Sequence, residues 1–256
     1  MNDFVAHIKL DSDDEKKAYY HLLPDHLKGV ALLAAEFAES FGCKNWGYAA
    51  GLIHDIGKFS DAFQKYIRAA VFEKSADPKN RKGSVDHSTA GAIYAATNKM
   101  PILDYLSAGH HSGLQDYSVK NSRLEKKECL DLVANRAKQF FLENKIPPLE
   151  SFKGIDVSKS SINMLVRLMF SALVDADYLD TEKFFYSDRE RGKFDSLEVL
   201  LERLQLHLKT LFENSPDTPI NRLRCGIDET CSNAAENYTG SYFSLSVPTG
   251  GGKTLA

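Results

Sequence analysis

Helical periodicity dominates the sequence. Apolar residues recur at three- and four-residue spacing through most of the first 212 of the 256 residues, the pattern of amphipathic helices with one buried face. No segment before about residue 240 alternates convincingly between apolar and polar residues, so we predict an all-α body. With 43% hydrophobic and 26% charged residues, the chain can bury a large core, and a disordered protein is excluded.

The expected helices follow from this periodicity together with Gly, Pro and Asn punctuation. They span residues 25–41, 45–56, 60–72, 88–96, 102–108, 123–144, 161–179, 196–212 and 220–237. The short polar segment 109–121 is expected to be a loop. The segment 161–179 is nearly continuous apolar sequence and too long for a strand, so we expect it to be the most buried helix.

Charge and hydropathy exclude several classes of protein. The formal net charge is -3 and the isoelectric point is near 6.2, which argues against a generally basic nucleic-acid-coating module but not against a local basic groove. No stretch approaches the ~20 apolar residues needed to cross a bilayer. The N-terminus lacks a signal-peptide pattern, so we expect a cytoplasmic protein without membrane association.

Histidines and aspartates supply the first functional signal. Five of the eight histidines lie at expected helix ends or in Gly-containing loops: His26, His54, His87, His110 and His111. Asp55 directly follows one of them. Asp175 and Asp177 fall in the apolar segment, where burying a carboxylate costs several kcal/mol unless it is paired or binds metal. The other three histidines, His7, His21 and His207, are interpreted as solvated or packed imidazoles.

This residue set indicates metal-assisted chemistry. Imidazole plus carboxylate without thiolate suits iron, manganese, cobalt, nickel or zinc, and the set is large enough for two ions. Two ions that share an aspartate would clamp the attacking and leaving oxygens of a phosphodiester and supply hydroxide near neutral pH. A single His-Asp pair would be weak evidence. The full set favours phosphoester hydrolysis.

The order of these residues resembles a known family. His26, His54-Asp55, His87, His110-His111 and Asp177 resemble the HD phosphohydrolase superfamily, specifically the HD nuclease domain of the CRISPR-associated type I helicase-nucleases, and most of all their C subtype. Four further segments extend the resemblance over essentially the whole chain: residues 54–66, 109–114, 175–182 and 248–254. The resemblance implies an HD-domain helical bundle in residues 1–213, followed in 214–256 by a linker and the start of a RecA-like α/β helicase domain.

The resemblance also implies the roles of the site residues. Asp55 becomes the bridging carboxylate between two divalent ions. One ion is completed by His26, His54 and Asp177, and the other by His87, His110 and His111. Asp177 is preferred to Asp175 because an aromatic residue, Tyr178, follows it. The expected ions are Mn, Ni, Co or Fe, with Mg as a further candidate.

Lys58 is the second implied catalytic residue. It matches a basic position that could hold the scissile phosphate or stabilise charge developing on it. The alternative is a solvated lysine after the expected end of a helix at Gly57.

The C-terminal segment carries a nucleotide-binding motif. A predicted strand at 242–247 precedes Thr249, Gly250, Gly251, Gly252, Lys253 and Thr254. In such loops glycine amides cradle phosphates, while Lys meets the β- and γ-phosphates and Thr holds Mg²⁺. Val247 replaces the first glycine of the strict motif, as in superfamily-two helicases. Because Ala256 ends the chain early, we expect ATP and Mg²⁺ binding only in the full-length helicase and no ATPase activity here.

Substrate and partners are implied by the same resemblance. The expected substrate is single-stranded DNA in type I CRISPR interference against foreign DNA, and the expected partners are the RNA-guided surveillance complex and phage-encoded inhibitors. Basic residues flank both metal loops and could form a track for the strand; they are Lys58, Lys65, Arg68, Lys74, Lys79, Arg81, Lys82, Lys120, Arg123, Lys126 and Lys127. A solvated charged face is the alternative.

Two other functions stay open from the sequence. The chain could be an HD phosphohydrolase that acts on a nucleotide or cyclic nucleotide, although the C-terminal motif argues against this. It could also be a non-catalytic docking module for the surveillance complex, with a merely structural metal site.

Overall fold

The computed structural model describes residues 4–12, 14, 17–72, 85–151, 159–187, 189, 192, 194–240 and 242–252, with the backbone alone at 159 and 160. The chain divides into two compact units, residues 1–189 and 190–256. This boundary precedes the one that we expected after residue 213, because the helix at 197–213 groups with the C-terminal residues. No helix in the described residues is long and apolar enough to cross a membrane.

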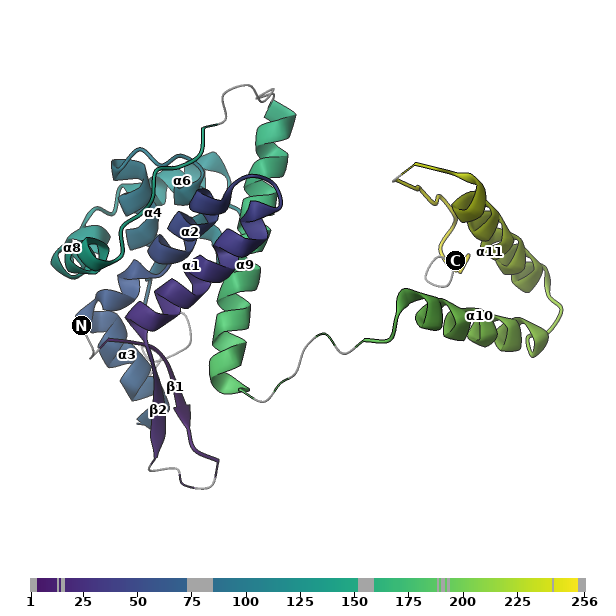
Figure 1. Cartoon of the computed structure of the whole chain (residues 1–256), viewed down its shortest axis with the longest axis horizontal. Helices are drawn as coiled ribbons and strands as arrows, with labels where there is room; N and C mark the ends of the chain where they lie inside the picture. The colour runs from purple at the N-terminus through teal and green to yellow at the C-terminus, as the bar shows by residue number, and fades with distance from the viewer. Residues whose placement is uncertain are drawn as a thin grey trace. The chain divides into compact units, whose positions relative to one another are not determined.

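The first unit is a helical bundle with a small hairpin (Figure 1). Its elements are β1 (Val5–Leu10), β2 (Ala18–Leu22), α1 (Leu23–Glu39), α2 (Lys44–Ile53), the 3-10 helix η1 (Ile56–Phe59), α3 (Asp61–Phe72), α4 (Ser88–Thr97), α5 (Leu103–Gly109), α6 (Tyr117–Leu124), α7 (Glu128–Asp131), α8 (Ala134–Glu143) and α9 (Lys159–Phe185). Most of the expected helices are therefore present within a few residues of their predicted bounds.

Close packing of α1 against α2 determines the centre of the bundle. Gly47 and Gly51 lie one turn apart on α2, and a Cβ at either would come within 2.3–2.4 Å of the α1 backbone at Ala34 and Ala31. Small residues on both helices therefore let the two backbones approach. α9 packs against the same pair, and Met169 and Leu173 from it complete the buried core.

The hairpin corrects the prediction of a wholly helical body. β1 and β2 pair antiparallel, with His7 opposite His21, and Gln64 of α3 binds both the amide and the carbonyl of Val5 at 3.0 Å. The apolar-polar alternation in β1 covers only a few residues, which is why helical periodicity elsewhere concealed it. The hairpin places two histidines against the N-terminal half of α1.

Three local predictions also need correction. The expected loop at 109–121 contains the start of α6, and the single helix expected at 123–144 is broken into the end of α6, α7 and α8. α9 is not the most buried helix: Ile162, Met164 and Leu168 are exposed and only one face is covered, whereas α2 is buried over most of its length. A continuous apolar run does not tell which of its faces is packed.

The second unit contains α10 (Leu197–Glu213), with Ser196 as its N-cap, and α11 (Pro219–Asn237), with Thr218 as its N-cap. The strand predicted at 242–247 is wrong for this chain: residues 242–248 have no regular structure, and no described strand lies beside them to bond their amides and carbonyls. Arg224 of α11 donates two hydrogen bonds to the Gly250 carbonyl, at 3.0 and 2.9 Å. Lys253 and Thr254 lie outside the described residues.

Candidate metal centre

The His54-Asp55 pair lies where α2 gives way to η1. α2 ends at Ile53, so His54 is its C-cap residue and Asp55 directly precedes η1. Both side chains are completely buried. The prediction that Gly57 ends this helix is wrong, because α2 already ends at Ile53. Gly57 instead lets the backbone of η1 approach that of His87, since a Cβ at Gly57 would lie 2.0 Å from the His87 carbonyl oxygen. The loop that carries His87 is therefore packed against η1.

An inner cluster forms around one oxygen of Asp55. It consists of His26 from α1, His54, Asp55 and Asp177 from α9. Asp55 Oδ2 lies 3.6 Å from His26 Nε2 and 3.4 Å from His54 Nε2. Asp177 Oδ1 lies 3.4 and 3.8 Å from the same two nitrogens. Three elements remote in sequence thus bring two imidazoles and two carboxylates together.

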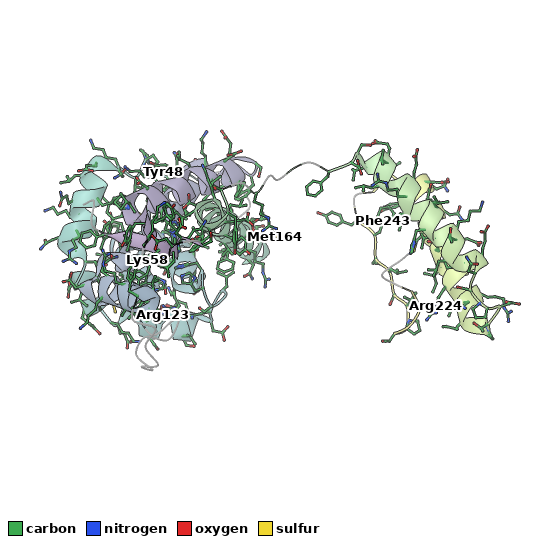
Figure 2. The ribbon with its side chains drawn as sticks, turned by 90° about the horizontal axis from the view of Figure 1, so that it is seen from below. Tyr48, Lys58, Arg123, Met164, Arg224 and Phe243 are labelled. Atoms are coloured by element: carbon green, nitrogen blue, oxygen red, sulfur yellow. The ribbon has the colours of Figure 1, made fainter. Side chains whose placement is uncertain are left out.

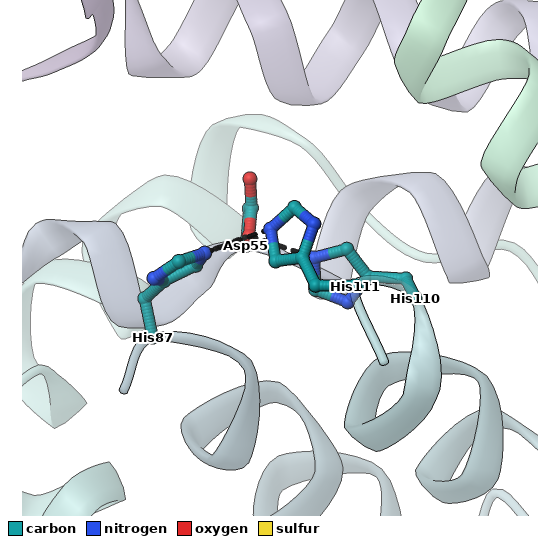
Figure 3. Close-up of side chains that lie close together, drawn as sticks. All are labelled: Asp55, His87, His110 and His111. Atoms are coloured by element: carbon teal, nitrogen blue, oxygen red, sulfur yellow. Dashed lines mark hydrogen bonds and ion pairs between the residues drawn. The ribbon is translucent and has the colours of Figure 1, made fainter. Parts of the chain in front are cut away.

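An outer cluster forms around the other oxygen of the same carboxylate, and consists of Asp55, His87, His110 and His111 (Figure 3). Asp55 Oδ1 lies 3.6 Å from His87 Nε2 and 3.2 Å from His110 Nε2, and His111 Nε2 lies 2.9 Å from His87 Nε2. His111 is exposed, whereas all inner-cluster residues are largely buried. The outer cluster is therefore the side open to solvent.

The spacing of these atoms suits metal ions. Two ligand atoms about 2.1 Å from one ion lie about 3.0–3.4 Å apart when the angle at the ion is tetrahedral or octahedral. The four distances between Asp55 oxygens and histidine Nε2 atoms, 3.2–3.6 Å, are close to that range. Either cluster could hold a divalent ion, with Asp55 contributing one oxygen to each.

Hydrogen bonds at the far side of the rings orient the histidines for this role. The Nδ1 atoms of His54, His87 and His110 lie 2.7, 3.0 and 2.8 Å from the carbonyl oxygens of Gly51, Val85 and Ser107. Since a carbonyl only accepts, each Nδ1 carries a proton and Nε2 faces the cluster. Nε2 of His26 and of His54 is buried without a hydrogen-bond partner among the described residues. Buried, unsatisfied nitrogens of this kind fit the role of metal ligands.

The electrostatics of the two clusters follow from burial and from the charges close to each group. Burial lowers the pKa of His54, but the negative charges of Asp55 and Asp177 outweigh it and raise the pKa to about 10. Burial raises the pKa of Asp55, yet the Lys58 and His54 charges hold it well below its usual range. In the outer cluster, burial lowers the pKa of His87, and lowers that of His111 to about 4. His87 and His111 are therefore neutral and able to bind metal at pH 7.

Lys58, labelled in Figure 2, is buried in the interior of the first unit. Its Nζ is 2.7 Å from Asp55 Oδ2, and the residue is only 4% exposed. The alternative of a solvated lysine is therefore wrong. The ammonium group partly neutralises the Asp55 carboxylate.

Residues outside the predicted ligand set hold the loops that carry the candidate ligands. Arg123 of α6 donates to the Ala108 carbonyl, to Ser88 Oγ and to Thr89 Oγ1, and so joins the segments that carry His87 and His110. Asp86 accepts hydrogen bonds from the amide and the hydroxyl of Thr89 at the start of α4. Burial raises the pKa of Asp86, but these two bonds outweigh it, and the pKa is lowered. Only the folded chain shows which carbonyls a given cation reaches.

This arrangement corrects part of the predicted basic track. Arg123 is engaged in the bonds just described, and Lys120 is 6% exposed with its Nζ 2.5 Å from Asp104 Oδ2. Both cations serve the fold and are not free for a nucleic-acid strand. Lys74, Lys79, Arg81 and Lys82 lie outside the described residues.

Two histidines dismissed from the sequence lie beside the inner cluster. His7 and His21 have rings 4.9 and 5.2 Å from that of His26, and the three offer nitrogen atoms within 4.8 Å of one another. Asp180 of α9, also not singled out, reaches both His26 and His21. Its position three residues after Asp177, on the same helical face, was the signal that could have found it. Asp175 is exposed and belongs to neither cluster.

Comparison with known proteins agrees with the geometry. The model of the HD domain family matches residues 24–140, which include every candidate ligand except Asp177. The chain therefore contains an HD domain, and the match supports the HD phosphohydrolase superfamily. HD domains are typically metal-dependent hydrolases, and the His/Asp clusters here could hold the metal. A search of curated proteins gave no match.

Proposed function

We propose that this chain, with its HD domain at residues 24–140, is a metal-dependent nuclease that hydrolyses phosphodiester bonds in single-stranded DNA at a two-ion site. The observation that carries the proposal is the division of Asp55: Oδ2 faces the inner cluster and Oδ1 faces the outer cluster. One carboxylate placed in this way suits two adjacent ions and not one.

The residues divide the work as follows. Asp55 would be shared by the two ions, His26, His54 and Asp177 would hold the inner ion, and His87, His110 and His111 would hold the outer one. Bound divalent ions supply Lewis acidity toward the phosphate and lower the pKa of a water molecule. The exposed His111 marks the side from which a phosphodiester reaches the site.

Lys58 has the second role in the proposal. Its ammonium group is beside Asp55 in the ion-free chain, and ions bound to Asp55 would repel it. A phosphate oxygen is then its natural partner, so Lys58 would stabilise negative charge on the reacting phosphate.

The biological role is proposed from the resemblance. We place the chain in type I CRISPR interference, in the cytoplasm, where an ATP-dependent helicase feeds it a displaced strand and an RNA-guided surveillance complex recruits it. The order of site residues and the Pro-Thr-Gly-Gly-Gly-Lys-Thr sequence at 248–254 support this. Without that sequence motif, the HD domain would suit a nucleotide phosphohydrolase equally well.

The test compares substrates and variants. End-labelled single-stranded DNA, a panel of mononucleotides and a cyclic dinucleotide are incubated with the chain and Mn²⁺, Ni²⁺, Co²⁺ or Mg²⁺. We expect cleavage of the DNA, its loss in Asp55→Ala, and full retention in Asp175→Asn, which changes an exposed carboxylate of α9. Cleavage that survives in Asp55→Ala, or hydrolysis of nucleotides alone, contradicts the proposal.

A further inference from the structure

Asp180 contacts His26 from the side opposite the inner cluster. Its Oδ2 lies 2.7 Å from His26 Nδ1, while His26 Nε2 faces Asp55 and Asp177. His26 is completely buried, and the Asp180 side chain is 12% exposed. The carboxylate, the imidazole and the inner cluster are thus in line.

This contact differs from its counterparts at the other ligand histidines. His54, His87 and His110 each donate Nδ1–H to a backbone carbonyl, whereas His26 donates to a carboxylate. An ionised carboxylate makes a stronger hydrogen bond than a carbonyl, and it makes the opposite nitrogen a more basic ligand.

A glycine on α1 provides the space that the Asp180 carboxylate occupies. Gly29 follows His26 by three residues on α1, and a Cβ at that position would lie 2.1 Å from Asp180 Oδ1. On the other side, His21 Nε2 lies 3.5 Å from Asp180 Oδ2. Contacts from α1 and from the hairpin therefore hold the carboxylate against the ring of His26.

We infer that Asp180 is a positioning residue for the inner ion. By accepting Nδ1–H it fixes the tautomer and the ring orientation of His26, so that Nε2 keeps its lone pair toward the inner cluster. The inference rests on the proposed two-ion site. It gives His21 and Gly29 the role of holding Asp180 in place. It also argues against a third ion among His7, His21 and His26, because Nδ1 of His26, the nitrogen that faces away from the inner cluster, already donates to Asp180.

The test measures metal affinity site by site. The whole chain is titrated with Mn²⁺ by calorimetry as wild type, Asp180→Ala, Asp180→Asn and Gly29→Ala, with Asp175→Asn as the matched control on α9. We expect two ions in the wild type and the control. In Asp180→Ala the affinity for one ion falls about 10–100-fold, the usual effect of losing such a partner, and the other affinity is unchanged.

The remaining variants separate positioning from general damage. Asp180→Asn keeps the shape and an acceptor oxygen, so it should restore part of the lost affinity. Gly29→Ala keeps the carboxylate but displaces it, so it should reproduce the selective loss. Thermal unfolding of every ion-free variant checks that it is folded.

The outcomes are distinct. Equal weakening of both ions in Asp180→Ala, unchanged affinities, or no recovery in Asp180→Asn overturns the inference. A third ion in the wild type that is absent in His21→Ala also overturns it, because His26 Nδ1 would then be a ligand. A wild-type chain that binds only one ion contradicts the proposed two-ion function itself.

Discussion

Lys58 Nζ lies 2.7 Å from Asp55 Oδ2, and both residues are almost completely buried. The ammonium group therefore contacts the same Asp55 oxygen that faces His26 and His54 in the inner cluster. The lysine therefore competes with the inner ion for Asp55, although it would assist a phosphate at the same site. These two effects have opposite consequences for metal affinity and for catalysis.

Replacement of this lysine separates the two effects. In Lys58→Met, metal affinity should equal or exceed that of the wild type, because the competing charge is gone. The rate of phosphodiester hydrolysis should fall about 10²–10³-fold, the usual cost of losing one group that stabilises transition-state charge. Calorimetric titration and single-turnover cleavage measure the two quantities. Weaker metal binding at an unchanged hydrolysis rate would show that Lys58 serves only the fold of the site.

Metal binding should release protons. His54 has a pKa of about 10 in the ion-free chain, so it is protonated at pH 7 and must lose a proton to become a ligand. Affinity for the inner ion should therefore rise with pH, by about tenfold per pH unit below the pKa. Calorimetry at pH 7 in buffers of different ionisation enthalpy reports the release. His207→Gln, on exposed α10, is the control, and a binding heat independent of the buffer would refute the prediction.

A methyl group at Gly57 should damage the outer cluster. Its Cβ would lie 2.0 Å from the His87 carbonyl oxygen, which belongs to the backbone and cannot rotate away. We expect Gly57→Ala to lower the free energy of unfolding by about 1–3 kcal/mol and to weaken the outer ion more than the inner one. Denaturant unfolding and metal titration test this.

Gly226→Ala is the matched control for that variant. Nothing lies within 4 Å of the added Cβ on α11, so this change should instead stabilise the chain by about 0.5–1 kcal/mol. An equal change in the free energy of unfolding in Gly57→Ala and Gly226→Ala would contradict the explanation from close packing at Gly57.

Acid should destabilise the ion-free chain through the hairpin. Burial lowers the pKa of His7 to about 2 and that of His21 to about 4. Below about pH 6.5 the unfolded chain binds protons at these positions and the folded chain does not, so stability is present above that pH and lost as pH falls. His7 alone should contribute a loss of about 2 kcal/mol between pH 7 and 5.

The contribution of His7 is isolated by substitution. His54 acts in the opposite direction, since its raised pKa favours the folded chain as pH falls. The wild type and His7→Gln are therefore unfolded in denaturant with a chelator at pH 5, 6 and 7. The wild type should lose more stability than the variant toward pH 5. Parallel pH dependences would contradict the assignment.

The candidate ligands could be predicted from the sequence because their positions are local properties. His54 at the end of a helix, His110 and His111 in a glycine-flanked turn, and an aspartate in an apolar helix are all visible along the chain. The structure brings all seven candidates into the two expected groups, and their role as ligands stays a prediction. Asp177 was chosen over Asp175 from the resemblance, and of the two only Asp177 lies in a cluster.

The support around the ligands could not be predicted in the same way. His7 and His21 gain their place beside His26 from a hairpin whose short alternation was overlooked. Arg123 and Lys120 were interpreted as a substrate track because sequence shows a charge but not the carbonyls and carboxylates that fold around it. The predicted strand at 242–247 failed for a related reason, since a strand requires a partner that periodicity alone does not supply.

The central claim is that Asp55 joins two adjacent metal ions. Electron paramagnetic resonance of the ion-free chain reconstituted with two equivalents of Mn²⁺ tests it most directly, because two Mn²⁺ ions bridged by one carboxylate are magnetically coupled. The account predicts a coupled-pair spectrum for the wild type and for Asp175→Asn, and its loss in Asp55→Ala. The signal of isolated Mn²⁺ ions in the wild type would contradict it.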